Sequence, residues 1–165
     1  MNVIDEVVAA NEQYVSGHEL QHLSPRPRRR LAIVSCMDTR LTHRTLGLAD
    51  GDAHIIRNAG GLVTDDVVRS LLVSIHVLGT EAVMIVNHTD CGQMLYEDES
   101  LRARLESGSG TSSPTPAHFL NFTNLEKNVW RQIHKLRGHP WIPKEIAVRG
   151  FIFNVESGRL REVLP

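Results

Sequence analysis

The chain of 165 residues is the size of one domain, and its 41% hydrophobic and 22% charged residues are typical of a globular protein. A formal net charge of −1 excludes the strong basic field of proteins that bind nucleic acids or anionic membranes. The sequence has no apolar run of membrane-spanning length and no basic region followed by an apolar core at its start. We therefore expect one cytoplasmic domain over residues 1–165, with no nucleic-acid or membrane partner.

The first 30 residues differ in character from the rest of the chain. Apolar residues recur at helical spacing over residues 2–15, which predicts a helix with an exposed apolar stripe. Residues 18–30 are polar and basic, and Pro25 and Pro27 prevent a helix there. Four arginines in this segment would suit an anionic partner, but isolated charge runs are common, so we favour a solvated connection to the first strand. Residues 1–30 are thus predicted to form a helix and a basic arm, with the helix packing on a partner subunit.

Three short apolar runs, each followed by polar or glycine residues, predict buried strands. They cover residues 31–35, 53–57 and 83–86. A short helix is expected over residues 42–48, and a longer one between the N-cap residue Thr64 and Gly79, a residue suited to the end of a helix. Strands that alternate with helices predict an α/β fold with three layers, in which helices flank a mostly parallel central sheet.

The second half of the chain continues this alternation. One or two short helices are predicted over residues 93–106, and a surface loop over the Ser-, Gly- and Pro-rich residues 107–116. A long amphipathic helix is predicted over residues 117–137. Apolar residues 146–155 and 159–163, separated by a turn, predict a last strand and an antiparallel edge strand.

Residues with distinctive chemistry follow two of the predicted strands. Cys36 follows the first run, and His88 and Cys91 follow the third. Ligands bind at the carboxyl ends of the strands in open α/β sheets, and thiolate and imidazole are preferred zinc ligands. Three protein ligands leave a fourth position for water, as in catalytic zinc sites. We therefore predict one zinc site formed by Cys36, His88 and Cys91.

Further candidate residues lie near the same edge of the sheet. Asp38 and Arg40 lie two and four residues beyond Cys36, where Arg40 would keep Asp38 ionised through charge-assisted hydrogen bonds. Asp38 would then accept a hydrogen bond from zinc-bound hydroxide and aim the lone pair of its oxygen at an electrophile. The turn formed by Asn58, Ala59, Gly60 and Gly61 also follows a strand, and is a candidate wall of the substrate pocket.

Other interpretations of these residues remain open. Cys36 would be an inert buried thiol if it bound no metal, and Asp38 would be a helix cap with a surface pair to Arg40. Asp90 would compete as an oxygen ligand. Cys36 and Cys91 would alternatively form a redox pair, although neither belongs to a Cys-x-x-Cys motif. The zinc interpretation rests on the coincidence of pattern and position.

Three motifs occur in the order and spacing of a known family: Cys36-Met-Asp38-Thr-Arg40, Arg57-Asn-Ala-Gly-Gly61 and His88-Thr-Asp-Cys91-Gly92. Together they resemble the β-class carbonic anhydrases, most closely their compact bacterial and archaeal branch. The resemblance extends from the first strand to residues 148–160. Two features depart from it: Gln93 stands where many relatives have a second glycine, and the loop over residues 107–116 is peculiar to this chain.

The resemblance implies reversible hydration of carbon dioxide to bicarbonate and a proton, by zinc-bound hydroxide that the Asp38–Arg40 dyad orients. It implies Zn²⁺ on Cys36, His88 and Cys91, and a homodimer or homotetramer in which the N-terminal helix wraps the partner. Relatives on this scaffold act on carbon disulfide or carbonyl sulfide, which is one alternative. A non-catalytic zinc-binding oligomer is another, but such a protein has no use for the intact dyad.

Overall fold

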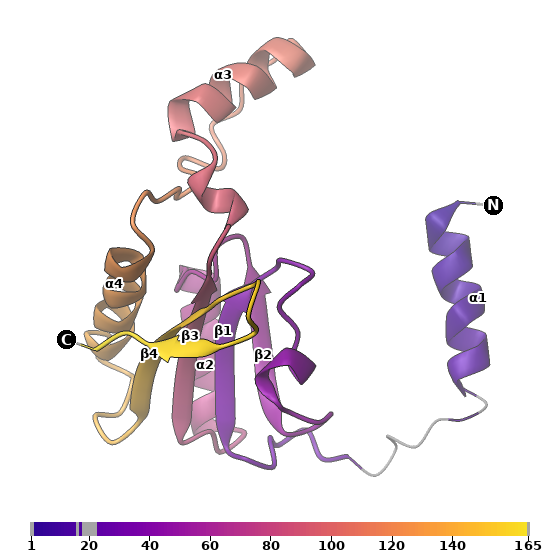
Figure 1. Ribbon diagram of the computed structural model, residues 1–165, viewed down its shortest axis with the longest axis vertical. Coiled ribbons are helices and arrows are strands. Elements are labelled where there is room, and N and C mark those ends of the chain that lie inside the picture. Colours follow the sequence, from indigo (N-terminus) through magenta and orange to yellow (C-terminus); the bar gives the residue numbers. More distant parts are fainter. Residues whose placement is uncertain (1, 16, 18–22, 165) are drawn as a thin grey trace.

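The structure of the protein is a computed structural model that describes residues 2–15, 17 and 23–164. Its centre is a five-stranded sheet in the order β2-β1-β3-β4-β5, in which only the β4–β5 pair is antiparallel (Figure 1). This confirms the predicted α/β fold with a mostly parallel sheet, flanking helices and an antiparallel edge strand. The strands are β1 (Leu31–Cys36), β2 (Ala53–Asn58), β3 (Ala82–His88), β4 (Ala147–Phe153) and β5 (Leu160–Glu162).

One face of the sheet is covered by the helices α2 (Asp65–His76) and α4 (Leu125–Arg137). The Thr64 side chain accepts a hydrogen bond from the Val67 backbone N–H, so α2 begins at the predicted cap. Both helices contribute to one buried core with alternate residues of the strands, which include Ala32, Val34, Val83, Ile85, Val129, Ile133, Val148 and Ile152. This core is the larger of two buried cores in the described chain.

The opposite face of the sheet has a smaller core and thinner cover. A short 3-10 helix, η2 (Arg44–Leu46), replaces the longer helix predicted over residues 42–48. The smaller core includes Ile33, Leu41, Leu62, Val86, Phe122 and Phe153. In the described part of the chain no α-helix contributes a buried residue to this core, and connecting segments cover it instead.

α4 rests directly on the backbone of β4 at Gly150. A Cβ atom at Gly150 would lie 2.4 Å from Val129 Cγ1 and 2.6 Å from Ile133 Cδ1, distances that no real contact allows. The glycine therefore permits the close approach of helix and strand.

The segment between β3 and α4 departs from the prediction at two points. The helices η3 (Gly92–Met94) and α3 (Asp98–Ser109) confirm the short helices expected near residues 93–106, but α3 continues into the first residues of the loop predicted over residues 107–116. The helix predicted over residues 117–137 is wrong in its first part, because α4 begins only at Leu125. The Asn124 side chain caps α4 by accepting a hydrogen bond 2.9 Å long from Lys127 N. Leu120, with a φ of 61°, also cannot continue a helix.

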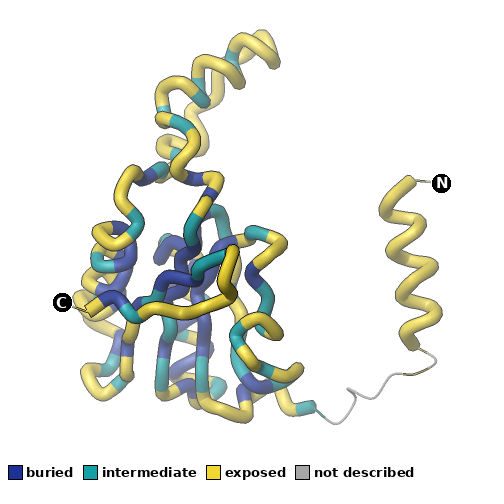
Figure 2. The backbone as a smooth tube through the Cα atoms, viewed as in Figure 1, coloured by how far each residue is buried: buried dark blue, intermediate teal, exposed yellow. Residues whose placement is uncertain are grey.

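α1 (Val3–Val15) confirms the predicted N-terminal helix, and it stands apart from the sheet with no buried residue (Figures 1 and 2). Part of the basic arm, residues 18–22, lies outside the described residues. Arg28 and Arg29 lie 2.9 and 3.2 Å from the Asp52 carboxylate, and Arg30 pairs with Glu81. These arginines thus form ion pairs with acidic residues of the same chain, which agrees with a segment that connects the helix to the first strand. Across the described chain, no helix combines the length and the apolar character needed to span a bilayer.

Candidate metal centre

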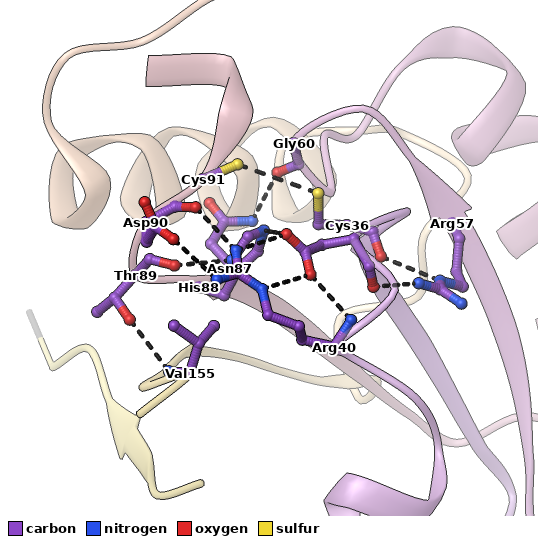
Figure 3. Close-up of polar contacts among 11 residues, drawn as sticks. Cys36, Arg40, Arg57, Gly60, Asn87, His88, Thr89, Asp90, Cys91 and Val155 are labelled. Carbon is purple, nitrogen blue, oxygen red and sulfur yellow. Dashed lines mark hydrogen bonds and ion pairs between the residues drawn. The ribbon is translucent and has the colours of Figure 1, made fainter. Parts of the chain in front are cut away.

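Adjacent parallel strands bring the three predicted ligands to one edge of the sheet. Cys36 is the last residue of β1 and His88 is the last residue of β3. Ser35 lies opposite Val86 in the register of these strands, so both strands reach the same edge. Cys91 follows three residues after His88, in a turn where Asp90 adopts a φ of 55°. Register and turn together therefore place two thiols and an imidazole side by side (Figure 3).

The donor atoms of Cys36, His88 and Cys91 all lie within 4.8 Å of one another. The two sulfur atoms are 4.0 Å apart, and the residues are only 5%, 0% and 2% exposed. Both cysteines are free thiols. Among the described residues, this is the cluster of potential metal ligands that the structure brings together.

The orientation of His88 tests whether the cluster suits a metal ion. His88 Nδ1 lies 2.8 Å from the carbonyl oxygen of Thr89, to which it can only donate. Nε2 therefore carries the lone pair, and this buried atom has no hydrogen-bond partner among the described residues. A buried, unpartnered acceptor beside two thiols fits a bound metal ion, and the hydrogen bond to a backbone carbonyl is the usual support for a metal-bound histidine.

The thiols and the imidazole influence one another strongly. Hydrogen bonding from the Cys91 thiol lowers the pKa of Cys36 to about 4 and raises that of Cys91. His88 and the backbone amides of Asp38 and Gly60 also lower the pKa of Cys36. Burial lowers the pKa of His88, but the neighbouring Cys36 sulfur and the Thr89 carbonyl oxygen outweigh it and raise that pKa overall. The pair of thiols thus readily supplies one thiolate, and a metal ion would displace the proton of the other.

Arg40 connects the two loops that carry the ligands. Its Nε and one terminal nitrogen bind the two Asp38 carboxylate oxygens at 2.9 and 2.8 Å. Its other terminal nitrogen lies 2.8 Å from Asp90 Oδ2. The Arg40 hydrogen bonds hold the pKa of Asp38 well below its usual range, so Asp38 is ionised. Asp38 Oδ2 lies 3.8 Å from His88 Nε2, so the carboxylate faces the ligand cluster.

Two contacts of this site were not expected from the sequence. Asp90, an alternative oxygen ligand by its position in the chain, instead binds Arg40. Arg57 donates to the carbonyl oxygens of Cys36 and Asp38 at 3.0 and 2.6 Å, and so holds the backbone between ligand and dyad. The sequence motif Arg57–Gly61 includes this arginine, but the motif alone does not say what Arg57 binds. The parallel pairing of β1 and β2 places it beside Cys36 and Asp38.

The turn after β2 packs against the ligand Cys36. Asn58 closes the turn by bonding both the N–H and the carbonyl of Leu62 at 2.8 Å. Gly60 and Gly61 have φ values of 83° and 62°. A Cβ atom at Gly61 would lie 2.9 Å from Cys36 N, so the turn requires glycine both for its conformation and for its close approach. The participation of Asn58, Ala59, Gly60 and Gly61 in a substrate pocket stays a prediction.

The fold and the site together define an α/β protein with a buried cluster able to hold a metal, beside a carboxylate–guanidinium pair. The sequence profile described as carbonic anhydrase matches residues 31–160. The chain belongs to the β-carbonic anhydrase family and is an enzyme of that family.

Individual relatives agree with this membership. The chain is 38% identical over 169 residues to beta-carbonic anhydrase 1 of Mycobacterium tuberculosis, with all of both chains covered. A crystal structure of carbonic anhydrase from Streptococcus mutans has a TM-score of 0.92 and 43% identity, and 99% of each chain is covered. A carbon disulfide hydrolase of Acidithiobacillus thiooxidans is 36% identical, over 81% of this chain and 76% of that protein.

Proposed function

We propose that this enzyme catalyses the reversible hydration of carbon dioxide to bicarbonate and a proton, with zinc held by Cys36, His88 and Cys91. The observation that carries the proposal is the ionised Asp38 carboxylate, which Arg40 holds with its oxygen facing the ligand cluster. A structural metal site would have no use for an oriented carboxylate at this position. The beta-carbonic anhydrase 1 of Mycobacterium tuberculosis, similar along its whole length, supports the same activity.

The ligand set suits zinc, which favours sulfur and nitrogen donors in tetrahedral sites. Two thiolates and a neutral imidazole would balance the charge of a divalent ion and leave one tetrahedral position open. When bound, zinc would polarise a water molecule and so supply a nucleophile near neutral pH, an effect for which carbonic anhydrases are the standard example.

The residues around the cluster would then orient this nucleophile. Asp38 is ionised, so its oxygens only accept hydrogen bonds, and they select a nucleophile that presents its proton toward Asp38. The remaining lone pair would point toward the carbon atom of the substrate. Arg40 would keep the carboxylate fixed, and its second contact to Asp90 keeps the guanidinium itself in place.

Stopped-flow hydration of carbon dioxide, measured together with the metal content of the protein, tests this function. We expect activity in proportion to bound zinc, its loss after chelation, and its return when zinc is restored. Full activity in protein stripped of metal would contradict the proposal.

A second candidate substrate is carbon disulfide, because a similar protein is named a carbon disulfide hydrolase. The same nucleophile and Asp38 would serve both substrates, and access to the site would decide between them. Release of hydrogen sulfide from carbon disulfide, compared as kcat/KM with carbon dioxide hydration in one preparation, separates the two. We expect carbon dioxide to be preferred, and the reverse ratio would assign the chain to the second activity.

We further propose that the whole chain is one domain that works as a homodimer or homotetramer. The apolar stripe of α1 is open to solvent: Val3, Ile4 and Val7 are 70%, 69% and 64% exposed. Residues 1–30 would form the arm that packs on a partner subunit, because a second copy can cover the apolar area that this chain leaves exposed. We propose the cytoplasm as the location, since a reducing compartment keeps both thiols free.

A further inference from the structure

Three buried amide side chains form a continuous chain of hydrogen bonds between α4 and the edge of the sheet. Gln132 Nε2 donates to Asn128 Oδ1 at 3.0 Å, and Asn128 Nδ2 donates to Asn87 Oδ1 at 2.8 Å. All three residues are buried, with exposures of 6%, 2% and 1% for Gln132, Asn128 and Asn87. Each amide donates in one direction and accepts from the other, so the three side chains are oriented as a set.

The two ends of this chain of amides bind the backbone within and just after the glycine turn that follows β2. At one end Asn87 Nδ2 donates to the carbonyl oxygens of Gly60 and Gly61 at 2.9 and 3.2 Å. At the other end Val63 N donates to Gln132 Oε1 at 2.8 Å. The turn after β2 is thus held at two points by side chains that themselves take no part in the ligand cluster.

This turn touches the metal centre directly. Gly61 lies so close to Cys36 that an added Cβ atom would meet both Cys36 N and Ser35 C at 2.9 Å. The Gly60 backbone N–H also faces the Cys36 sulfur. Asn87 also precedes His88 on β3, so the amide chain joins the backbone beside one ligand to the turn beside another (Figure 3).

We propose that Asn87, Asn128 and Gln132 are positioning residues that hold the glycine turn against Cys36 and thereby set the spacing between the Cys36 and His88 donors. Loss of Asn87 would remove the buried donor of the turn carbonyls, and loss of Asn128 or Gln132 would remove the hydrogen bonds that orient this donor, so either change would leave the turn free to withdraw. The Cys36 sulfur would then lose its support and bind a metal with altered geometry. The inference rests on the metal site proposed above and not on the identity of the substrate.

Replacement of the central amide tests the proposal. Asn128→Leu keeps the approximate shape of the side chain but removes its donor and its acceptor. Cobalt(II) serves as the probe, because the absorption bands of its thiolate complexes report the geometry of the sulfur ligands, and competition with a chelator gives its affinity. We expect Asn128→Leu to weaken cobalt binding by about 10- to 100-fold and to shift the thiolate-to-cobalt bands. A loosened core alone would leave the band positions of the bound ion unchanged.

Ile133→Val is the matched control, since Ile133 is a buried residue of the same helix outside the amide chain. It should lower thermal stability while the cobalt bands and affinity stay those of the wild type. If Asn128→Leu does not fold, Gln132→Met decides by the same criteria, because it removes only the link between Asn128 and Val63.

Two results would overturn the positioning role: wild-type bands and affinity in the folded amide variant, or equal changes in Ile133→Val. Failure of the wild-type protein to bind cobalt at all would refute the metal site itself, and is distinguishable from both.

Discussion

The carboxyl edge of the sheet and the two projecting helices, α1 and α3, differ in how far their residues are buried. At the edge, Cys36, His88 and Cys91 are buried, and Arg40 ties the surrounding loops together. α1 and α3 have no buried residue at all, and both extend away from the sheet (Figure 2). One copy of the chain is therefore sufficient to assemble the ligand cluster, but it does not cover its own apolar surface.

Helix α3 and the loop that follows it, residues 98–119, are held together by hydrogen bonds within this segment. Arg102 donates to the carbonyl oxygens of Ser113, Pro116 and Ala117, which pins the connecting loop to the helix. Asp98 accepts from Phe119 N at 2.9 Å at the base of the segment. This segment thus has a defined shape without a core, whereas α1 is a single helix with no buried residue.

The most disruptive change at the buried edge is the loss of a ligand. Cys91→Ser replaces a thiolate by a hydroxyl, a poor zinc ligand, so metal content and carbon dioxide hydration should fall together. The loss should exceed the roughly 10- to 100-fold effect typical of a changed partner of a ligand. Elemental analysis and stopped-flow kinetics measure the two quantities. Ser100→Ala, on the exposed α3, is the control and should leave both quantities unchanged. A zinc-free Cys91→Ser enzyme with full activity would show that the buried cluster does not hold the catalytic metal.

Removal of the oriented carboxylate should separate metal binding from turnover. Asp38→Ala should retain zinc but lose about 10²-fold or more in kcat/KM, the effect of a misplaced nucleophile. Asp66→Ala, on the exposed surface of α2, is the matched control and should have wild-type kinetics. Unchanged rates in Asp38→Ala would leave Asp38 with a structural role only.

Substitutions in the exposed apolar stripe of α1 test whether this helix packs on a partner subunit. The double variant Val7→Asp and Val8→Asp removes two side chains whose burial on a partner contributes about 3 kcal/mol, or about 100-fold in the dissociation constant of the assembly. Sedimentation velocity over a range of concentrations measures this change, and deletion of residues 2–15 should have a larger effect. Glu12→Gln, a polar change on the same helix, should sediment as the wild type. An equally stable assembly after the deletion would refute the docking of α1.

The smallest expected effect lies where the arm joins the sheet. The Ala49 backbone N–H, followed by Arg28 and Arg29, lowers the pKa of Asp52 in the folded protein. A carboxylate with a depressed pKa stabilises the fold above its unfolded pKa of about 3.9, and this contribution is lost as the pH falls through the folded value. The melting temperature of Asp52→Asn should therefore lie below that of the wild type at pH 7, and the gap should narrow below about pH 4. Glu99→Gln on α3 is the control, and a gap that does not depend on pH would contradict the ionic role of Asp52.

The sequence alone was sufficient to predict the parallel sheet and the meeting of Cys36, His88 and Cys91. Strand ends have a strong pattern, and parallel strands bring their carboxyl ends to one edge whatever the exact register. The start of α4 was not predictable, because the apolar spacing continues through residues 117–124 while Asn124 and Leu120 end it locally. The local cap at Asn124 and the backbone conformation of Leu120 thus outweigh the apolar periodicity.

Contacts between polar side chains far apart in the chain were the least accessible. The pairing of Arg40 with Asp90 spans 50 residues, and that of Asn87 with Asn128 spans 41. The sequence does not show whether an asparagine on a helix is buried or exposed, because asparagine is common on exposed helix surfaces. Only the packing of α4 on the sheet turns Asn128 inward.

The packing of α4 on the sheet depends on a glycine, which has no Cβ atom, at position 150 of β4. At Gly150 the side chains of α4 reach the backbone of β4 because the glycine has no methyl group. The distance between α4 and the sheet therefore depends on a strand that provides none of the proposed metal ligands. An alanine there would push the helix outward and draw Asn128 away from its partner on the neighbouring strand. The position of the amide chain beside the ligand cluster thus depends on a residue of β4 that is not itself one of the ligands, and an engineer who redesigns this scaffold should leave Gly150 unchanged.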